Sequence, residues 1–250
     1  MIGATSGVRR ALAFLTPVGG AAEPGPSALG WFPVVGAAIG AALGCLWWGA
    51  SRAWSPAVAA AIVVAGDLAA TGALHFDGLV DAADGLLPPL SRARRLQVMR
   101  DPSVGAFGVA AAVVALLGRW AALAALRPSV LLLTGLWAAS RAVMAVVATA
   151  VPYARADDGG LATAFLPPAR RQGRGPGAGQ VGAVGLAVAV GCVTAWRPLA
   201  GCAALASGVV ASAALVWLAF RRLGGFTGDV LGAAGVVLET VALVVAAARW

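Results

Sequence analysis

The chain has 250 residues, 60% of them hydrophobic and only 11% charged, whereas soluble domains carry about 25% charged residues. Together with a mean hydropathy of +0.88, this composition excludes an ordinary soluble protein and predicts a membrane protein. All 18 basic residues are arginines and there is one histidine, which excludes a Walker A lysine, a Schiff base and a zinc site with two histidine ligands. The three cysteines form no CxxC pair, so no disulfide framework is expected.

Long apolar stretches define the predicted elements. A helix needs about 20 apolar residues to cross a bilayer, and seven stretches approach this length: 31–50, 56–76, 103–126, 129–151, 178–196, 198–220 and 229–248. Residues 1–27 are expected to form an N-terminal interfacial segment, and residues 77–102 and 152–180 to form polar loops. The predicted fold is therefore all-α: a polytopic membrane helix bundle with about seven transmembrane helices in a single integral membrane domain, 1–250.

Arginine placement predicts the orientation. With the N-terminus in the cytoplasm, twelve arginines fall in inside segments and four in outside segments, which is the bias expected of cytoplasmic loops. Both polar loops then face the cytoplasm, so function is expected there. The expected location is a multi-pass protein of the cytoplasmic (inner) membrane of a prokaryote. The lipid bilayer is an expected partner and nucleic acid is not, because topology explains the basic excess.

An acidic segment follows the second stretch. Asp77, Asp81 and Asp84 are spaced by four and three residues, which places them within about 60° of one another on a helix. Such carboxylates repel one another unless a divalent cation lies among them, and hard oxygen ligands suit Mg²⁺ or Mn²⁺. The alternative is a solvated acidic helix end. His75 is a candidate base, or a histidine bonded to backbone or headgroups.

Two glycine-containing segments could contact phosphate. Arg100 and Asp101 precede Gly105 and Gly108 at the start of the third stretch, which indicates either a phosphate contact at a helix N-terminus or an ordinary helix cap. The turn 224–229, Gly-Gly-Phe-Thr-Gly-Asp, could cradle an anion with its amides and supply Asp229 as a metal ligand. A plain turn is the alternative.

Four charged residues lie inside predicted spans: Asp67, Arg119, Arg141 and Glu239. Charges within a membrane are costly and are usually paired or functional. We expect at least one acid–arginine pair among them, with a structural role or a role in substrate binding.

These segments together resemble the cobalamin synthase family, the adenosylcobinamide-GDP ribazoletransferases. The family pattern TGGLHxDGxxDxxDG corresponds to residues 71–85, with Ala73 in place of the second glycine and Phe76 where an acid is common. The pattern [KR]DxxxGxxG corresponds to residues 100–108, a PYxR-type segment to 152–155, and GGxTGDxxG to 224–232. Residues 14–17, Phe-Leu-Thr-Pro, match the family's start only in part.

The resemblance implies a Mg²⁺-dependent transferase that joins adenosylcobinamide-GDP to α-ribazole, or to its 5′-phosphate, and releases GMP. It implies a metal on Asp77, Asp81 and Asp84, with Asp229 as a further ligand, and a proton acceptor among the aspartates or His75. The implied substrate-binding residues are Arg100, Asp101, Arg155, Thr227 and Gly228. The oligomeric state is left open, with a homo-oligomer as one alternative.

Two other functions compete with this interpretation. A CDP-alcohol phosphotransferase uses similar chemistry, but the Ala-Arg of its motif does not follow Asp77-Gly78 at the required place. A small transporter or channel would instead depend on the four charges inside the spans.

Overall fold

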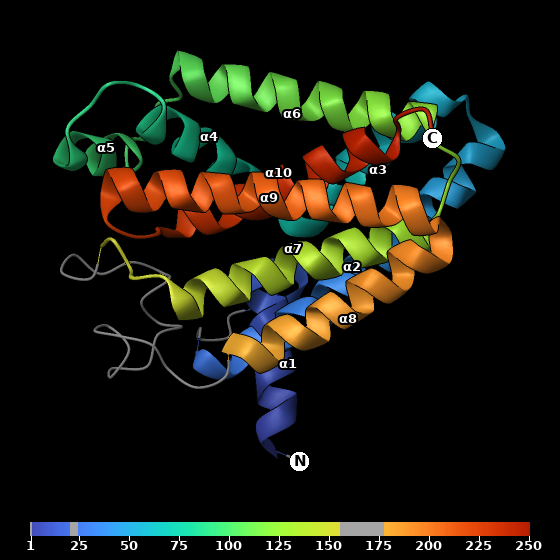
Figure 1. Cartoon of the computed structure of the whole chain (residues 1–250), viewed down its shortest axis with the longest axis horizontal. Helices are drawn as coiled ribbons and strands as arrows, with labels where there is room; N and C mark the ends of the chain where they lie inside the picture. Colours follow the sequence, from blue (N-terminus) through green and yellow to red (C-terminus); the bar gives the residue numbers. More distant parts are fainter. Residues whose placement is uncertain (1, 21–24, 156–177) are drawn as a thin grey trace.

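The computed structural model describes residues 2–20, 25–155 and 178–250, and this part of the chain is helical apart from short connections. An N-terminal helix, α1 (Ile2–Leu15), and two short 3-10 turns lead into α2 (Phe32–Ala53). The helices that follow are α3 (Pro56–Thr71), α4 (Leu74–Leu86), α5 (Arg92–Val98), α6 (Ala106–Ala125), α7 (Val130–Ala150), α8 (Ala178–Trp196), α9 (Pro198–Leu223) and α10 (Gly228–Ala246). The axes of most long helices lie roughly along one line, and α1 crosses them (Figure 1).

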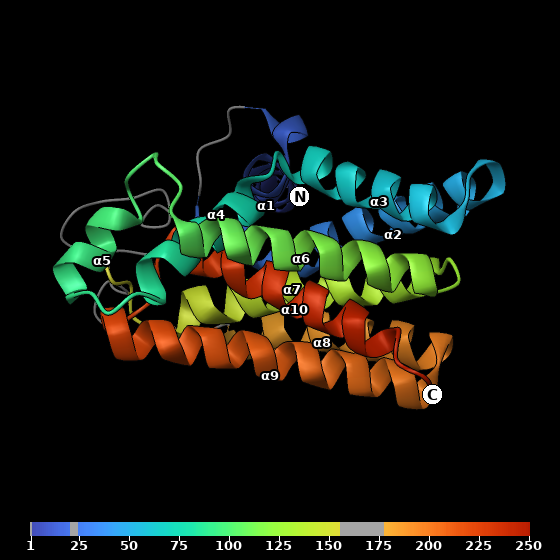
Figure 2. The ribbon, with the colours of Figure 1, turned by 90° about the horizontal axis from the view of Figure 1, so that it is seen from above.

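The last helix is at the centre of the bundle. α10 packs against α4, α6, α7 and α9, while α7 also packs against α2 and α8. The view from above shows α6 and α9 on opposite sides of α10 (Figure 2). The short helix α5 lies at one end of the bundle, where it contacts α4 and α9.

Within the described residues, five helices are long and apolar enough to cross a membrane: α2, α6, α7, α9 and α10. This confirms the all-α membrane bundle and a multi-pass membrane protein. The expected count of seven spans is corrected to five, or to six if α3 and α4 are taken as one bent element. α3 has only 16 residues, about 24 Å of helix against a bilayer core of about 30 Å, and the apolar part of α8, Val181–Trp196, is also short.

The first expected polar loop, 77–102, contains helical structure. Most of α4 and all of α5 fall within it, and α4 packs into the bundle rather than extending from it. α4 is not one of the five membrane-spanning helices. Most of the second expected loop, 152–180, lies outside the described residues.

Candidate active site

A sharp turn between α3 and α4 sets the direction of the acidic segment. Gly72 and Ala73 both adopt left-handed backbone angles, with φ of 58° and 57°, and the axes of the two helices meet at 91°. The amide of Ala73 closes the end of α3 by donating to the carbonyl of Leu68 at 2.8 Å. Left-handed angles suit glycine but strain alanine, and Ala73 is the one non-glycine residue with positive φ in the part of the chain that the structure describes.

Two glycines let α4 and α10 approach closely. A Cβ added to Gly78 would lie 2.8 Å from the carbonyl oxygen of Asp229, and one added to Gly232 would lie 3.0 Å from the Cα of His75. Any larger side chain would push the helices apart. The contact therefore brings Asp229 next to the acidic face of α4, from a position about 150 residues later in the sequence.

Asp84 caps the helix that follows it in space. Its side chain is buried, and its two oxygens accept hydrogen bonds from the amides of Gly105 at 2.7 Å and Gly108 at 2.9 Å. These are unpaired donors of the first turn of α6, and a carboxylate there also interacts favourably with the helix dipole. The absence of a Cβ at both glycines makes room for the carboxylate. Of the two interpretations of the segment with Gly105 and Gly108, the structure thus supports an ordinary helix cap.

The other two aspartates of α4 are more open. Asp77 is exposed and Asp81 is half-buried. Partial burial raises the pKa of Asp81 to about 7, and the negative charges of Asp77, Asp229 and Asp84 add to this effect while Arg155 opposes it. Four acids therefore act on one another electrostatically. Within the described residues, however, no three histidine, cysteine, aspartate or glutamate side chains are grouped closely enough to hold one metal ion.

Two chain segments far apart in the sequence pair beside α10. Phe226 donates its amide to the carbonyl of Pro152 at 2.9 Å, and Ala154 donates to the carbonyl of Phe226 at 2.8 Å. This pairing aligns the PYxR-type segment with the glycine turn. As a result, Arg155 Nη2 lies 3.2 Å from Asp229 Oδ2.

The turn before α10 holds Asp229 from a second side. Thr227 donates its hydroxyl to Asp229 Oδ2 at 3.2 Å and accepts the amide of Val230 at 3.3 Å, so it is the N-cap of α10. Gly228 is the first residue of that helix.

Five of the predicted site residues meet around one small pocket of about 150 Å³. They are His75, Asp77, Arg155, Gly228 and Asp229. His75 is buried, and neither of its ring nitrogens has a hydrogen-bond partner among the described residues. A buried imidazole without partners is costly, so this side chain is available to a ligand in the pocket.

The remaining predicted residues lie around the pocket rather than on its described wall. Arg100 and Asp101 are exposed on the loop before α6, and Asp101 accepts the amide of Ser103 at 2.9 Å. Hydrogen bonds from the Ser103 side chain and amide lower the pKa of Asp101.

Sequence reasoning did not place Phe14, Met144 and Tyr153 in the site, yet all three line the pocket. Tyr153 belongs to the PYxR-type segment and Phe14 to the partial match at the N-terminus, so two of them carried a sequence signal.

Three arginines near the site bond to helix C-termini. Arg95 donates to the carbonyls of Gly85 and Leu86 at 2.8 and 2.7 Å, Arg92 donates to that of Leu223 at 2.7 Å, and Arg222 also reaches Leu86. Cations favour these unpaired carbonyls. These arginines therefore hold α4, α5 and α9 together, in addition to their expected part in orienting the protein in the membrane.

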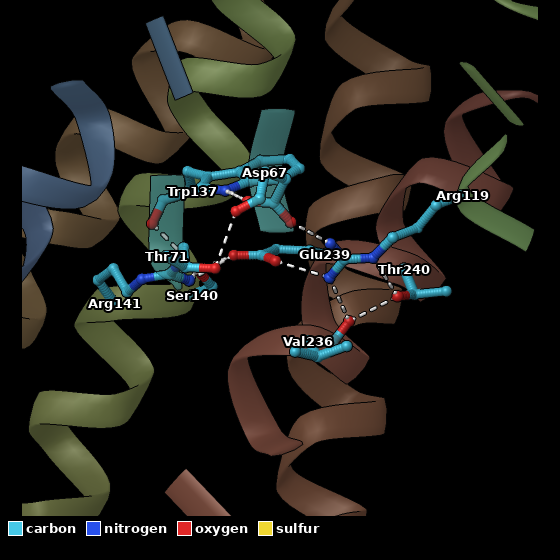
Figure 3. Close-up of polar contacts among 9 residues, drawn as sticks. All are labelled: Asp67, Thr71, Arg119, Trp137, Ser140, Arg141, Val236, Glu239 and Thr240. Carbon is cyan, nitrogen blue, oxygen red and sulfur yellow. Dashed lines mark hydrogen bonds and ion pairs between the residues drawn. The ribbon is translucent and has the colours of Figure 1, made fainter. Parts of the chain in front are cut away.

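The four charges inside the bundle form one network (Figure 3). Arg119 of α6 contacts Asp67 of α3 at 2.6 Å and Glu239 of α10 at 2.7 Å, and Arg141 of α7 contacts the other oxygen of Glu239 at 2.5 Å. All four side chains are buried. The expected acid–arginine pairing is confirmed, and because the two acids balance the two arginines, the network holds four helices together without net charge.

Neutral side chains complete the network. Trp137 donates to Asp67 at 2.9 Å, Ser140 donates to Glu239 at 2.6 Å, and Arg119 donates to Thr240 at 2.8 Å. The carboxylates are thus satisfied by protein groups rather than aligned along a path for a transported ion.

Comparison with known proteins agrees with these motifs. A family model described as cobalamin-5-phosphate synthase matches residues 7–247. A protein of Chlorobium phaeovibrioides, named adenosylcobinamide-GDP ribazoletransferase, is 35% identical over 95% of this chain and 93% of its own length. Proteins with the same name from Chlorobaculum parvum and Bradyrhizobium diazoefficiens are each 37% identical, over 98% and 96% of this chain and 96% and 93% of their own lengths. No solved structure matches the chain.

Proposed function

The chain belongs to the cobalamin-5-phosphate synthase family, and on that premise we propose that it is an adenosylcobinamide-GDP ribazoletransferase. It joins adenosylcobinamide-GDP to α-ribazole, or to α-ribazole 5′-phosphate, and releases GMP. The reaction takes place at the cytoplasmic face of a prokaryotic inner membrane, the side to which the arginine distribution assigns the site.

The observation that carries this proposal is the convergence of three family segments on one pocket. His75 and Asp77 come from the first segment, Arg155 from the PYxR-type segment, and Asp229 from the closing turn. These residues are far apart in the sequence. An acidic face, an arginine and a buried imidazole without partners are the groups that a phosphoryl-type transfer requires.

A divalent cation would bind beside the pocket only if the acids moved toward it, because no three of the described acids lie close enough together to hold one ion as they stand. The pKa of Asp81 is raised first by partial burial and then by the nearby negative charges of Asp77 and Asp229, and a bound cation would reduce that repulsion. We assign the Mg²⁺ ligands (Mn²⁺ as the alternative) to these three residues. The oxygens of Asp84 already accept two amide hydrogen bonds, so Asp84 fixes α4 against α6. Bound Mg²⁺ would neutralise the diphosphate and its GMP leaving group.

The protein groups have separate tasks in the transfer. The ribazole 3′-hydroxyl oxygen forms a bond to the cobinamide-linked phosphorus, and the bond from that phosphorus to the GMP oxygen breaks. His75 accepts the hydroxyl proton, because it lines the pocket and its ring nitrogens have no hydrogen-bond partner among the described residues. Arg155 holds a diphosphate oxygen, with Asp229 keeping it in place before substrate arrives. Arg100, Asp101, Thr227 and Gly228 remain predicted substrate contacts at the edge of the site.

The proposal is tested by GMP release. The full chain, reconstituted in liposomes, is supplied with adenosylcobinamide-GDP, α-ribazole and Mg²⁺, and GMP and the cobamide product are quantified. We expect both to form in equal amounts and to require both substrates. Folded protein that forms no product with either ribazole form would refute the proposed activity. Full turnover in excess chelator would refute only the proposed dependence on Mg²⁺.

The competing functions fit the geometry less well. The four charges inside the bundle bond to one another, so the helices that the structure describes offer a transporter none of the free intramembrane charges it would need. The family-model match extends over nearly the whole chain, beyond what a CDP-alcohol phosphotransferase motif would explain.

A further inference from the structure

An apolar groove of about 630 Å³ lies between α7, α8 and α9, away from the candidate active site. Its wall consists of apolar residues and glycine, among them Val143 of α7, Leu186 of α8 and Trp217 of α9. These three helices lie side by side in Figure 1. The volume is that of a small-molecule site rather than of a packing defect.

The groove opens toward the surroundings of the bundle. Leu186 and Trp217 are more than half exposed, at 53% and 59%, and Val210 on the same helix as Trp217 is 67% exposed. Since α9 is long and apolar enough to cross a membrane, its exposed side chains Trp217 and Val210 are placed to face lipid hydrocarbon, and Leu186 of the neighbouring helix α8 borders the same opening. A molecule that lies in the groove must therefore be apolar along most of its length.

One end of the groove carries a positive charge. The guanidinium of Arg221 lies 5.2 Å from the centre of the Trp217 ring, and Trp217 and Phe220 both line the groove. Arg221 is exposed in the last turn of α9. The arginine distribution predicts that this end of the helix faces the cytoplasm. An apolar groove that ends at an exposed arginine is complementary to an acyl chain attached to an anionic headgroup.

We propose that this groove binds one anionic phospholipid of the bilayer, with an acyl chain between α7, α8 and α9 and its phosphate against Arg221. The site goes beyond the proposed catalytic function and does not depend on it. It also adjoins the catalytic segment, because Val151 and Pro152 line the groove and the carbonyl of Pro152 accepts a hydrogen bond from Phe226 in the turn before α10. A bound lipid would therefore stabilise the segment that places Arg155.

Lipid binding can be measured by native mass spectrometry of the full chain in detergent. The delipidated protein is titrated with palmitoyl-oleoyl phosphatidylglycerol or with the corresponding phosphatidylcholine. Ala213→Trp fills the groove, because Ala213 lines it. Ala214→Trp is the matched control, since Ala214 is exposed on the neighbouring position of α9 and lies outside the groove wall. Arg221→Gln removes the headgroup contact, and Arg249→Gln changes an exposed arginine beyond the end of α10.

We expect one saturable phosphatidylglycerol on the wild type and on both controls, and none on Ala213→Trp. Arg221→Gln should retain chain binding but lose the preference for phosphatidylglycerol by about fivefold, the effect of roughly 1 kcal/mol from one arginine near an anionic headgroup. Equal binding by the two tryptophan variants would overturn the proposal. So would displacement of the lipid by adenosylcobinamide-GDP, which would make the groove a substrate site, or a dimer that Ala213→Trp dissociates without any lipid bound. If Ala213→Trp fails to fold, the comparison of Arg221→Gln with Arg249→Gln still decides it.

Discussion

Gly78 of α4 lies directly against the backbone of Asp229 at the start of α10, so that an added Cβ would come within 2.8 Å of the Asp229 carbonyl oxygen. This contact joins the two segments that carry the proposed metal ligands. The acidic face of α4 and the carboxylate of Asp229 can lie close together only because residue 78 has no side chain.

Gly78→Ala should therefore lower both activity and stability. The methyl group must displace α10 from α4, which costs about 1–3 kcal/mol in a well-packed interior, and it moves Asp229 away from Asp81. GMP release and thermal unfolding in detergent measure the two effects. Gly49→Ala is the control, because a Cβ at Gly49 in α2 has no atom within 4 Å. Equal activity in the two variants would contradict the close contact.

Asp81→Asn should separate function from stability. Folding raises the pKa of Asp81 from 3.8 to about 7, so between these values the folded state holds the proton more tightly and the stability of the metal-free protein falls as pH rises. The penalty is complete above about pH 7. In chelator, Asp81→Asn is then more stable than the wild type, on the order of 1 kcal/mol after solvent screening, while GMP release is nearly abolished.

The pH profile of unfolding distinguishes this cause from a general effect. The advantage of Asp81→Asn should grow from pH 4 to pH 7 and shrink when Mg²⁺ is added to the wild type. Asp101→Asn is the comparison, because hydrogen bonds from Ser103 lower the pKa of Asp101 and the amide should give no such advantage. A pH-independent difference would refute the electrostatic explanation.

Asp84→Asn should behave in the opposite way. The amide group loses the charge that favours the first turn of α6, and its nitrogen faces a backbone donor, either Gly105 or Gly108. We expect a loss of about 1–2 kcal/mol in the free energy of unfolding, which added Mg²⁺ does not restore. Asp77→Asn, on the exposed face of the same helix, should leave stability nearly unchanged. Wild-type stability of Asp84→Asn would show that the cap contributes little.

Ala73→Gly should stabilise the protein. Alanine at φ 57° is strained by about 1–2 kcal/mol, and glycine relieves this strain at the cost of some flexibility in the unfolded chain. The expected net gain is up to about 1 kcal/mol, seen as a higher unfolding temperature. Ala69→Gly, at an exposed helical position of α3, should instead destabilise by about 0.5–1 kcal/mol. A destabilised Ala73→Gly variant would contradict the left-handed turn.

Arg119→Met tests the buried network. It leaves Asp67 and Glu239 without their shared counter-charge, and the loss of one partner from a buried ion pair costs about 3–5 kcal/mol. We expect a large fall in unfolding temperature, whereas Arg127→Met, at an exposed connection, has little effect. An Arg119→Met variant that folds as stably as the wild type would show that the network has no structural role.

The membrane class, and the position of the three aspartates on one helix, could be predicted from the sequence because they depend on local properties. Apolar length marks each span, and the spacing of Asp77, Asp81 and Asp84 places them on one helix whatever surrounds it. The described residues give fewer spans than expected for two reasons: hydropathy alone cannot reveal the left-handed break at Gly72 and Ala73, and the apolar part of α8 is short. Which acids would bind a metal ion could not be predicted, because helix packing determines what each carboxylate contacts. Asp84 accepts amide hydrogen bonds from α6, and Asp229, far along the chain, packs against Gly78 of α4.

By itself, the sequence determined that this is an all-α membrane protein with an acidic segment, a set of arginines and two glycine segments that together indicate diphosphate chemistry. Only the tertiary structure decided which acid caps a helix, which arginine meets Asp229, how the four charges inside the bundle pair, and that a groove ends at Arg221. The physical reason is that composition and periodicity act along the chain, whereas hydrogen bonds and ion pairs form between helices that only the packing of glycines and apolar faces brings together.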